Sequence, residues 1–362
     1  MKKLVYITCD AWWDTDINIL PELGKDFDLE VFCISDKNPA KCKYPQKDLP
    51  SNIKFHNCNF RKSRKDPVTI LLSFFYFVWI YFSTIGKVTF WVVDNNLFYI
   101  YPLLLCISKK RTIISFHNYV EHGDSQRIDN WLAKQELKKM SLFHLQSEGQ
   151  GLIFAKENPT KKSFFTYMAV KSFGSPKRTE RFFNNDKKTF LFFGSAREYK
   201  RLDMFIEAAE QFQGSANFII AGHCSNWDKY KDRTIGNSSL LCNITFIDNE
   251  DIPDYFTLSD FLVLPYEDST QSGPLLIAYN YNLPIIASNL PYFTDMVHDG
   301  YDGFIFEKGS QDSLNLAIKE AIDLSSDNYQ KLLENLRSTV NEYKNKSDFS
   351  NSLKQFIKLN IK

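Results

Sequence analysis

The sequence lacks an excess of charge of either sign: 44 lysines and arginines face 43 aspartates and glutamates, for a net charge of +1 over 362 residues. Proteins that follow nucleic-acid phosphates need a surplus of cations on one face, so this balance removes the electrostatic argument for a nucleic-acid-binding protein. Disorder is excluded as well, because 44% of the residues are hydrophobic and are able to bury a core. A chain of this length favours two domains.

Paired cysteines and a long N-terminal apolar run are also missing. The seven cysteines are odd in number and form no C-x-x-C pair, so we expect free thiols in a reducing cytosol and neither a disulfide framework nor a zinc site. The apolar run from Leu4 to Thr8 ends before Asp10 and is too short for the core of a signal peptide. We therefore predict a cytoplasmic protein.

Aromatic residues, in contrast, are abundant, and many of them lie in an uncharged run of eighteen residues from Val68 to Ile85. The basic residues Arg61, Lys62, Arg64 and Lys65 precede this run. Its length reaches the threshold for a transmembrane helix. Three interpretations stay open: a spanning helix, a wholly buried core helix, and a helix at a membrane surface with basic residues nearby. Because strand patterns flank the run, we favour the third and expect residues 61–85 to attach the protein peripherally to the inner face of the cell membrane.

Short apolar runs alternate with helical stretches, which is typical of α/β domains whose parallel sheets are covered on both faces. The predicted strands are 3–8, 29–34, 53–55, 88–93, 112–116 and 141–146 in the first half, and 189–193, 217–221, 243–247, 261–264, 284–287 and 303–306 in the second. A polar, aperiodic segment predicts a linker at 171–188 between domains at 1–170 and 189–345. The chain is helical after Gln311. A final helix at 346–362 has one apolar face, which we expect to pack back on the first domain.

Two cations follow the first strand of the second half. Gly194 permits a tight turn and the close approach of a ligand, and Arg197 and Lys200 come next, at the carboxyl end of a strand where open α/β sheets bind ligands. A diphosphate suits such a pair of cations, above all when it gains charge as a leaving group. A solvated surface loop is the alternative.

A second anion site is predicted where small and polar residues precede a helix. Ser269, Thr270, Gln271, Ser272 and Gly273 stand directly before Pro274, a favoured first residue of a helix. The free N–H groups of a helix start bind anions, and the hydroxyl groups add donors. An ordinary capped helix is the alternative.

The order of these motifs resembles the retaining glycosyltransferases of the GT-B fold, specifically the large family 4, or glycosyl transferases group 1. The resemblance covers residues 187–325. It rests on Gly194 with a Lys six residues later, the strand ending in Gly222, the acidic turn before Ser259-Asp260, the Pro265 segment, and LPIIAS followed by DGYDGFIFEKGS. It implies an α/β protein with two Rossmann-like domains facing across a cleft. Residues 1–170 would bind the acceptor and 189–345 the nucleotide sugar, without a metal or other cofactor.

The resemblance also has departures. The family commonly carries two glutamates eight positions apart, which here correspond to Ser269 and Ile277. Glu267 or Asp268 would partly replace the ribose contact. One branch of the family has Gln-Ser-Gly in this loop and an Arg three residues after the glycine, and this chain fits that branch. In it, Arg197 substitutes for the cation usually found at the position of Ser195.

Candidate residues of the first half follow the strand at 112–116 and the first strand. The resemblance implies that His117 faces the cleft and contacts the donor sugar, although a structural His is the alternative. Trp13, Asp16, Asn118 and His122 are candidates for binding the acceptor, since aromatic faces stack on sugars and carboxylates bind hydroxyl groups. Buried tryptophans in a plain surface loop are the alternative. Asp14 and Asp16 mimic a D-x-D metal motif, but we predict no metal site.

The sequence thus predicts a glycosyltransferase that moves a sugar from a nucleotide diphosphate sugar to a glycan or lipid-linked acceptor in bacterial-type surface polysaccharide synthesis. The predicted catalytic residues are His117, Arg197 and Lys200. The predicted donor-binding residues are Gly194, Ser195, Gly222, Glu267, Ser269, Thr270, Gln271, Ser272 and Gly273. Two alternatives stay open: a noncatalytic GT-B subunit that binds glycans or serves assembly, and another GT-B enzyme such as a nucleotide-sugar epimerase.

Overall fold

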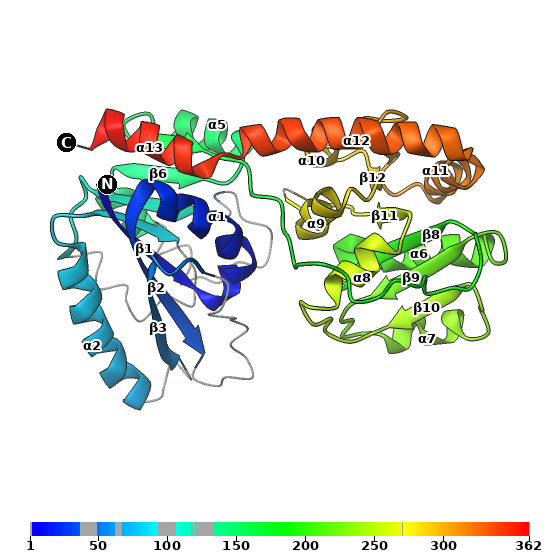
Figure 1. Cartoon of the computed structure of the whole chain (residues 1–362), viewed down its shortest axis with the longest axis horizontal. Helices are drawn as coiled ribbons and strands as arrows, with labels where there is room; N and C mark the ends of the chain where they lie inside the picture. Colours follow the sequence, from blue (N-terminus) through cyan, green and yellow to red (C-terminus); the bar gives the residue numbers. More distant parts are fainter. Residues whose placement is uncertain are drawn as a thin grey trace. The chain divides into compact units, whose positions relative to one another are not determined.

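The computed structural model describes residues 2–36, 49–61, 67–92, 106–116, 119, 134–269 and 271–361. The chain divides into two compact units, drawn in Figure 1. Unit 1 comprises Met1–Ala169 together with Lys346–Lys362, and unit 2 comprises Val170–Asn345. Each unit is built around its own parallel sheet, which confirms the α/β prediction.

The sheet of unit 1 has seven parallel strands in the order β3-β2-β1-β4-β5-β6-β7. Their bounds are β1 Lys2–Cys9, β2 Phe27–Asp36, β3 Lys54–Arg61, β4 Val88–Val92, β5 Thr112–Phe116, β6 Leu142–Leu145 and β7 Lys162–Phe165. The helices around it are α1 (Trp13–Asp26, after a short 3-10 turn at Asp10–Trp12), α2 (Pro67–Thr84), α5 (Glu148–Glu157) and α13 (Phe349–Asn360).

Both faces of this sheet are covered, so its central strands are buried and mostly apolar. Successive side chains of β1 point to opposite faces: Val5 and Ile7 enter the core that includes residues of α2 and α5. Leu4 and Tyr6 enter the core shared with α1 and α13. The apolar face of α13 therefore lies beside α1 on unit 1, as predicted for the final helix (Figure 1).

Unit 2 has six parallel strands in the order β10-β9-β8-β11-β12-β13. They are β8 Thr189–Phe193, β9 Asn217–Ala221, β10 Leu240–Asn243, β11 Phe261–Leu264, β12 Ile285–Ser288 and β13 Gly303–Phe306. The helices are α6 Leu202–Gln211, α7 Asp228–Thr234, α8 Ile252–Thr257, α9 Gly273–Tyr281, α10 Pro291–Thr294, α11 Gln311–Asp323 and α12 Ser326–Lys346, with a 3-10 turn η5 at Glu198–Lys200.

The strand predictions fail at three of the four sheet edges. Strand β3 starts one residue later than predicted and runs to Arg61, β10 ends where the predicted strand 243–247 begins, and β7 was not predicted. All three are edge strands. An edge strand is only partly covered and need not carry a continuous apolar run, so the pattern that identifies central strands is weak there.

Helix α2 is half exposed, so the alternative of a wholly buried core helix is wrong. Six of its large apolar side chains are between 42% and 64% exposed: Val68, Leu71, Phe74, Phe75, Trp79 and Phe82. On the other face Ile80 is buried, and Leu72, Tyr76, Phe77 and Tyr81 pack against the core. Within the described ranges, we find no helix with the length and apolarity that a membrane crossing requires.

Candidate functional site

A glycine follows each of the strands β8 and β9, where the two strand ends approach each other closely. Gly194 and Gly222 have φ values of +96° and +145°, where side chains are strained. The amide of Gly194 donates to the carbonyl oxygen of Ala221 at 2.8 Å. A Cβ on Gly222 would lie 2.2 Å from the carbonyl oxygen of Gly194. Gly222 therefore shapes the turn at Gly194, which leaves a backbone surface without side chains at the carboxyl edge of the sheet.

Lys200, at the end of η5, reaches this turn. Its Nζ lies 3.6 Å from the position that a Cβ on Gly194 would take, and 5.3 Å from the ring centroid of Tyr266. Burial, with a smaller contribution from the positive charge of Arg197, lowers the pKa of Lys200 to about 8. Its ammonium makes no hydrogen bond or salt bridge with any residue that the structure describes. Because withdrawing a charge from water is costly unless the charge is compensated, this cation is suited to binding an anion.

Arg197 is exposed at the start of η5 and contributes positive charge beside Lys200. The structure thus brings together the two predicted cations and Gly194, at the carboxyl edge of the sheet of unit 2. This is the edge at which open α/β sheets bind ligands.

Helix α9 begins at the predicted loop. Ser272 is its N-cap, and the Ser272 hydroxyl accepts a hydrogen bond from the amide of Leu275. Ser269 Oγ donates to the carbonyl oxygen of Gln271 at 2.9 Å. Both hydroxyl groups therefore stabilise the loop, as an ordinary capped helix requires. Pro274 has no N–H and the Leu275 amide is used by the cap, so the Gly273 amide is the donor that the first turn offers a ligand. Thr270 lies outside the described residues.

Glu267, one of the two acidic candidates of this region, already has a partner. Glu267 forms a salt bridge with Arg201, whose guanidinium also binds Asp203. Ile277, at the position of the family's second glutamate, is buried in α9. Position 277 therefore offers no carboxylate to a ribose, and the Glu267 carboxylate is already bound to Arg201.

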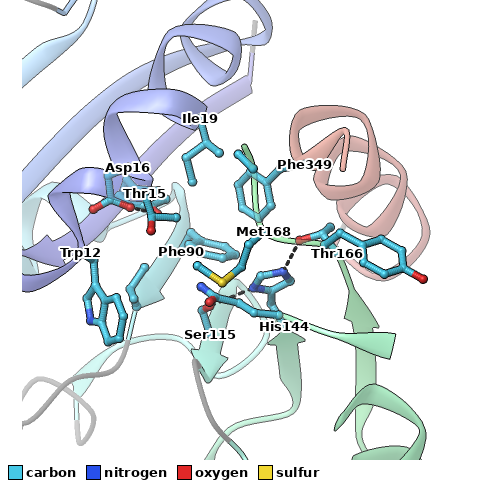
Figure 2. Close-up of a pocket in the computed structure, with 15 residues that line it drawn as sticks. Trp12, Thr15, Asp16, Ile19, Phe90, Ser115, His144, Thr166, Met168 and Phe349 are labelled. Carbon is cyan, nitrogen blue, oxygen red and sulfur yellow. Dashed lines mark hydrogen bonds between the residues drawn. The ribbon is translucent and has the colours of Figure 1, made fainter. Parts of the chain in front are cut away.

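A small pocket in unit 1, open to solvent, lies at the carboxyl ends of β1, β4, β5, β6 and β7 (Figure 2). Trp12, Thr15, Asp16 and Ile19 line it from the start of α1, and Phe349 lines it from α13. The rest of the wall includes five further residues labelled in Figure 2: Phe90, Ser115, His144, Thr166 and Met168. Apolar walls with a few polar groups are typical of small-molecule sites.

Asp16 supplies a buried carboxylate to this pocket. It is 2% exposed and accepts hydrogen bonds from Tyr6 Oη at 2.8 Å and Thr8 Oγ1 at 2.6 Å. Burial, and then the negative charge of Asp16, raise the pKa of Tyr6. Trp13 does not line the pocket. It lies in the core, where its ring and that of Phe55 pack edge to face with their centroids 5.3 Å apart. Of these two predicted acceptor residues, the structure places only Asp16 in the pocket.

His144 is a pocket residue that the sequence analysis did not identify, since it lies inside an apolar strand. Its Nδ1 and Nε2 are each 2.8 Å from a hydroxyl group, those of Ser115 and Thr166. Burial lowers the pKa of His144 to about 3, so the ring is neutral near pH 7. It therefore connects three adjacent strands as an uncharged hydrogen-bonding group. His117, Asn118 and His122 lie outside the described residues.

Comparisons with known proteins agree with this architecture. Residues 175–341 match the family described as Glycosyl transferases group 1. A glycogen synthase of Thermodesulfovibrio yellowstonii is 28% identical over 173 residues, which are 46% of this chain and 34% of that relative. The chain thus spans about a third of that protein's length.

Solved structures match nearly the whole chain. A sucrose-phosphate synthase from Thermosynechococcus elongatus superposes with a TM-score of 0.73 at 12% identity, covering 99% of both chains. Anabaena Alr3699/HepE in complex with UDP and glucose gives 0.72 at 12% identity, again over 99% of both. S. aureus TarM gives 0.71 at 13% identity over 100% of both. The fold is therefore GT-B, and the match to the glycosyl transferases group 1 family covers residues 175–341, within unit 2.

Proposed function

We propose that this protein is a retaining glycosyltransferase that moves a sugar from a nucleotide diphosphate sugar to a glycan or lipid-linked acceptor in bacterial-type surface polysaccharide synthesis. The observation that carries the proposal is Lys200, a partly buried cation without a counter-charge in the described structure, beside the side-chain-free turn at Gly194. The group 1 domain supports it. So does the structural similarity to HepE, which was solved with UDP and glucose.

In this proposal unit 2 holds the donor. The Gly273 amide at the start of α9 and the backbone around Gly194 and Gly222 surround the diphosphate, and Arg197 and Lys200 neutralise the charge that it gains as it leaves. These two cations supply positive charge without a metal. With Ser269 in place of a glutamate there is no carboxylate nucleophile at that position. The acceptor oxygen therefore bonds to the anomeric carbon on the face that the phosphate oxygen leaves, and that phosphate oxygen takes the acceptor's proton.

Unit 1 would bind the acceptor in the pocket of Figure 2. The Trp12 ring and the apolar walls offer surface to a sugar ring or a lipid-linked group. Asp16, held by Tyr6 and Thr8, offers a fixed acceptor for hydroxyl groups. We retain His117 as the proposed contact to the donor sugar, with Asn118 and His122 as proposed acceptor residues.

A panel of nucleotides tests the donor assignment. Thermal unfolding is measured with UDP, GDP, ADP and CMP, followed by hydrolysis and transfer assays on the corresponding nucleotide sugars. We expect one nucleoside diphosphate to raise the melting temperature, because a ligand at 100 times its Kd stabilises the folded state by about 2.7 kcal/mol. Absence of any shift across a broad panel of nucleoside diphosphates would contradict the proposal.

The missing carboxylate at Ile277 motivates a second candidate, a noncatalytic GT-B subunit that binds glycans or serves assembly. The same panel separates the two candidates. A glycan-binding subunit has no need of nucleotide stabilisation and would not hydrolyse or transfer a sugar from any donor. Transfer from one donor would exclude this candidate.

We also propose that the exposed apolar face of α2 attaches the protein to anionic membrane surfaces. Phe75→Glu and Phe82→Glu each place a charge where 61% and 64% of a Phe side chain is now exposed. Each Phe contributes about 1.5–3 kcal/mol when fully buried in lipid, so each variant should bind vesicles at least tenfold more weakly. Cosedimentation with vesicles that contain anionic lipid measures this.

Leu316→Glu is the matched control, since Leu316 is 66% exposed on α11 in unit 2 and should leave vesicle binding unchanged. Neutralising the basic residues at 61–65 should release the protein at moderate salt, because charge attraction to lipid headgroups is screened. Wild-type protein that stays in the supernatant with anionic vesicles would refute the membrane proposal.

A further inference from the structure

Arg201 has a backbone conformation that is unusual for its residue type. It directly follows Lys200 and has a φ of +50° and a ψ of +52°, in the left-handed region. Among the residues that the structure describes, Asn282 is the other non-glycine residue with a positive φ. Asn is enriched in this conformation, whereas most other side chains are strained in it. A glycine would adopt the same backbone freely, so the strain at Arg201 points to a role for its side chain.

Two carboxylates fix the Arg201 guanidinium. Its Nε donates to Asp203 Oδ1 at 3.0 Å, and its Nη2 donates to Asp203 Oδ2 at 2.8 Å. Its Nη1 donates to Glu267 Oε1, in the segment that follows β11. Although burial opposes it, the hydrogen bond from Arg201 lowers the pKa of Asp203. The side chain thus joins the start of α6 to the end of β11 through charged hydrogen bonds, which are stronger than neutral ones.

The two residues before Arg201 contact the same segment. The amide of Glu267 donates to the carbonyl oxygen of Tyr199 at 2.7 Å. The rings of Tyr199 and Tyr266 pack edge to face with their centroids 5.8 Å apart, and Lys200 Nζ lies 5.3 Å from the Tyr266 ring centroid. Tyr266 is buried, and its carbonyl oxygen accepts a hydrogen bond from Ser288 Oγ at 2.6 Å. Three consecutive residues of the turn are therefore attached to a segment that is itself held in the core.

The three cations of this turn differ in their partners. Within the described part of the chain, Arg197 and Lys200 form no salt bridge, whereas Arg201 binds two carboxylates that compensate its charge. Arg201 is therefore suited to holding the turn and not to binding an anion. We propose that Arg201 is a positioning residue, whose salt bridge with Glu267 holds Lys200 where it neutralises the leaving diphosphate. This inference rests on the proposed function, which assigns the diphosphate to Lys200.

Arg201→Gly tests the inference, because glycine keeps the left-handed backbone and removes only the side chain. A displacement of about 1 Å can cost a factor of 10², so a smaller shift of Lys200 should lower the kcat of sugar transfer about tenfold. The donor KM should stay nearly unchanged, since the charge that Lys200 neutralises develops in the transition state. The melting temperature should stay close to that of the wild type, because relief of backbone strain offsets the loss of a surface salt bridge.

A double variant distinguishes positioning from a general effect on the structure. Because Arg201 acts through Lys200, adding Arg201→Gly to Lys200→Ala should lower kcat no further than Lys200→Ala does alone. A general structural defect would instead lower kcat by the same factor in both backgrounds. Glu267→Ala removes the same salt bridge from its other side and should act as Arg201→Gly does. It also replaces Arg201→Gly if that variant does not give a folded protein by its thermal melt.

Two matched controls separate the salt bridge and the backbone from their location. Arg233→Ala removes another arginine–carboxylate pair of unit 2, in which Arg233 Nε lies 2.9 Å from Glu210 Oε1. Asn282→Gly places a glycine at the other left-handed position. Both variants should transfer sugar at the wild-type rate.

An unchanged kcat in either folded variant, Arg201→Gly or Glu267→Ala, would overturn the inference. An equal loss in the wild-type and Lys200→Ala backgrounds, or a change confined to the donor KM, would overturn it as well. Failure of the proposed function gives a different result. If Lys200→Ala loses turnover and Arg201→Gly does not, the function stands and only this inference is wrong. If Lys200→Ala itself has normal turnover, the leaving-group assignment is wrong and this inference fails with it.

Discussion

Lys200→Ala should lower the turnover of sugar transfer by a factor of about 10² or more, because loss of one group that stabilises developing charge typically costs that much. The group in question is a cation beside Gly194 without a described counter-charge, so a leaving diphosphate is the partner that it lacks. Arg197→Ala should act in the same direction and by a similar factor. Steady-state rates with the donor found in the nucleotide panel measure both.

The control for this prediction is Lys229→Ala, which removes an exposed lysine of α7 in the same unit and should leave the rate unchanged. Near-normal turnover in both Lys200→Ala and Arg197→Ala would refute their assignment to the leaving group. If Lys229→Ala lowered turnover as much as Lys200→Ala does, the cause would be a general effect of removing positive charge.

The lowered pKa of Lys200 predicts a pH dependence with opposite signs for binding and stability. Donor binding requires the ammonium, so donor affinity of the wild type should fall as the pH rises through about 8. The free energy of unfolding changes with pH in the opposite direction. The folded-state pKa lies below the unfolded value near 10.4, so the unfolded chain binds more protons between these values and the free energy of unfolding rises with pH there. Lys200→Ala should lose both dependences.

Gly222→Ala should lower the free energy of unfolding by roughly 2–4 kcal/mol, because the new side chain brings both backbone strain and a steric clash. The added Cβ would lie 2.2 Å from the carbonyl oxygen and 2.5 Å from the carbonyl carbon of Gly194, in a backbone region that L side chains rarely adopt. Relief requires the ends of β8 and β9 to separate. Since that movement displaces Gly194 from Lys200, nucleotide affinity should fall together with stability. Chemical denaturation and nucleotide titration measure the two effects.

Gly236→Ala is the matched control. Gly236 also has a positive φ, +80°, but a Cβ there would meet no atom of the described residues within 4 Å. Only the conformational cost of about 1–2 kcal/mol applies, and nucleotide affinity should stay as in the wild type. Equal losses of stability in the two variants would show that conformation alone matters at Gly222 and that the close approach of β8 and β9 does not.

The predictable part of the fold follows from burial. Strands β5, β8, β9, β11 and β13 occur where their apolar runs predicted them, because four of the five lie inside a sheet and need apolar residues on both faces. The edge strands β3, β7 and β10 need only partial cover, and their boundaries were misplaced or missed. Helix α13 was predictable for the same reason, since Phe349, Leu353, Phe356 and Ile357 recur at helical spacing and are buried in unit 1.

The candidate site divides along similar lines. Gly194, Arg197, Lys200 and the loop before Pro274 are recognisable in the sequence because each group of residues is local, with its glycine, cations and helix start within a few positions. The hydrogen bonds of His144 with Ser115 and Thr166, and the packing of the segment at Lys171 along α9, depend on which strands and helices become neighbours. Such pairings join residues far apart along the chain. In the polar segment 171–188, no local pattern marks Lys171 as different from Lys177. Lys171 is buried because its segment packs along α9, whereas Lys177 is exposed and pairs with Glu250.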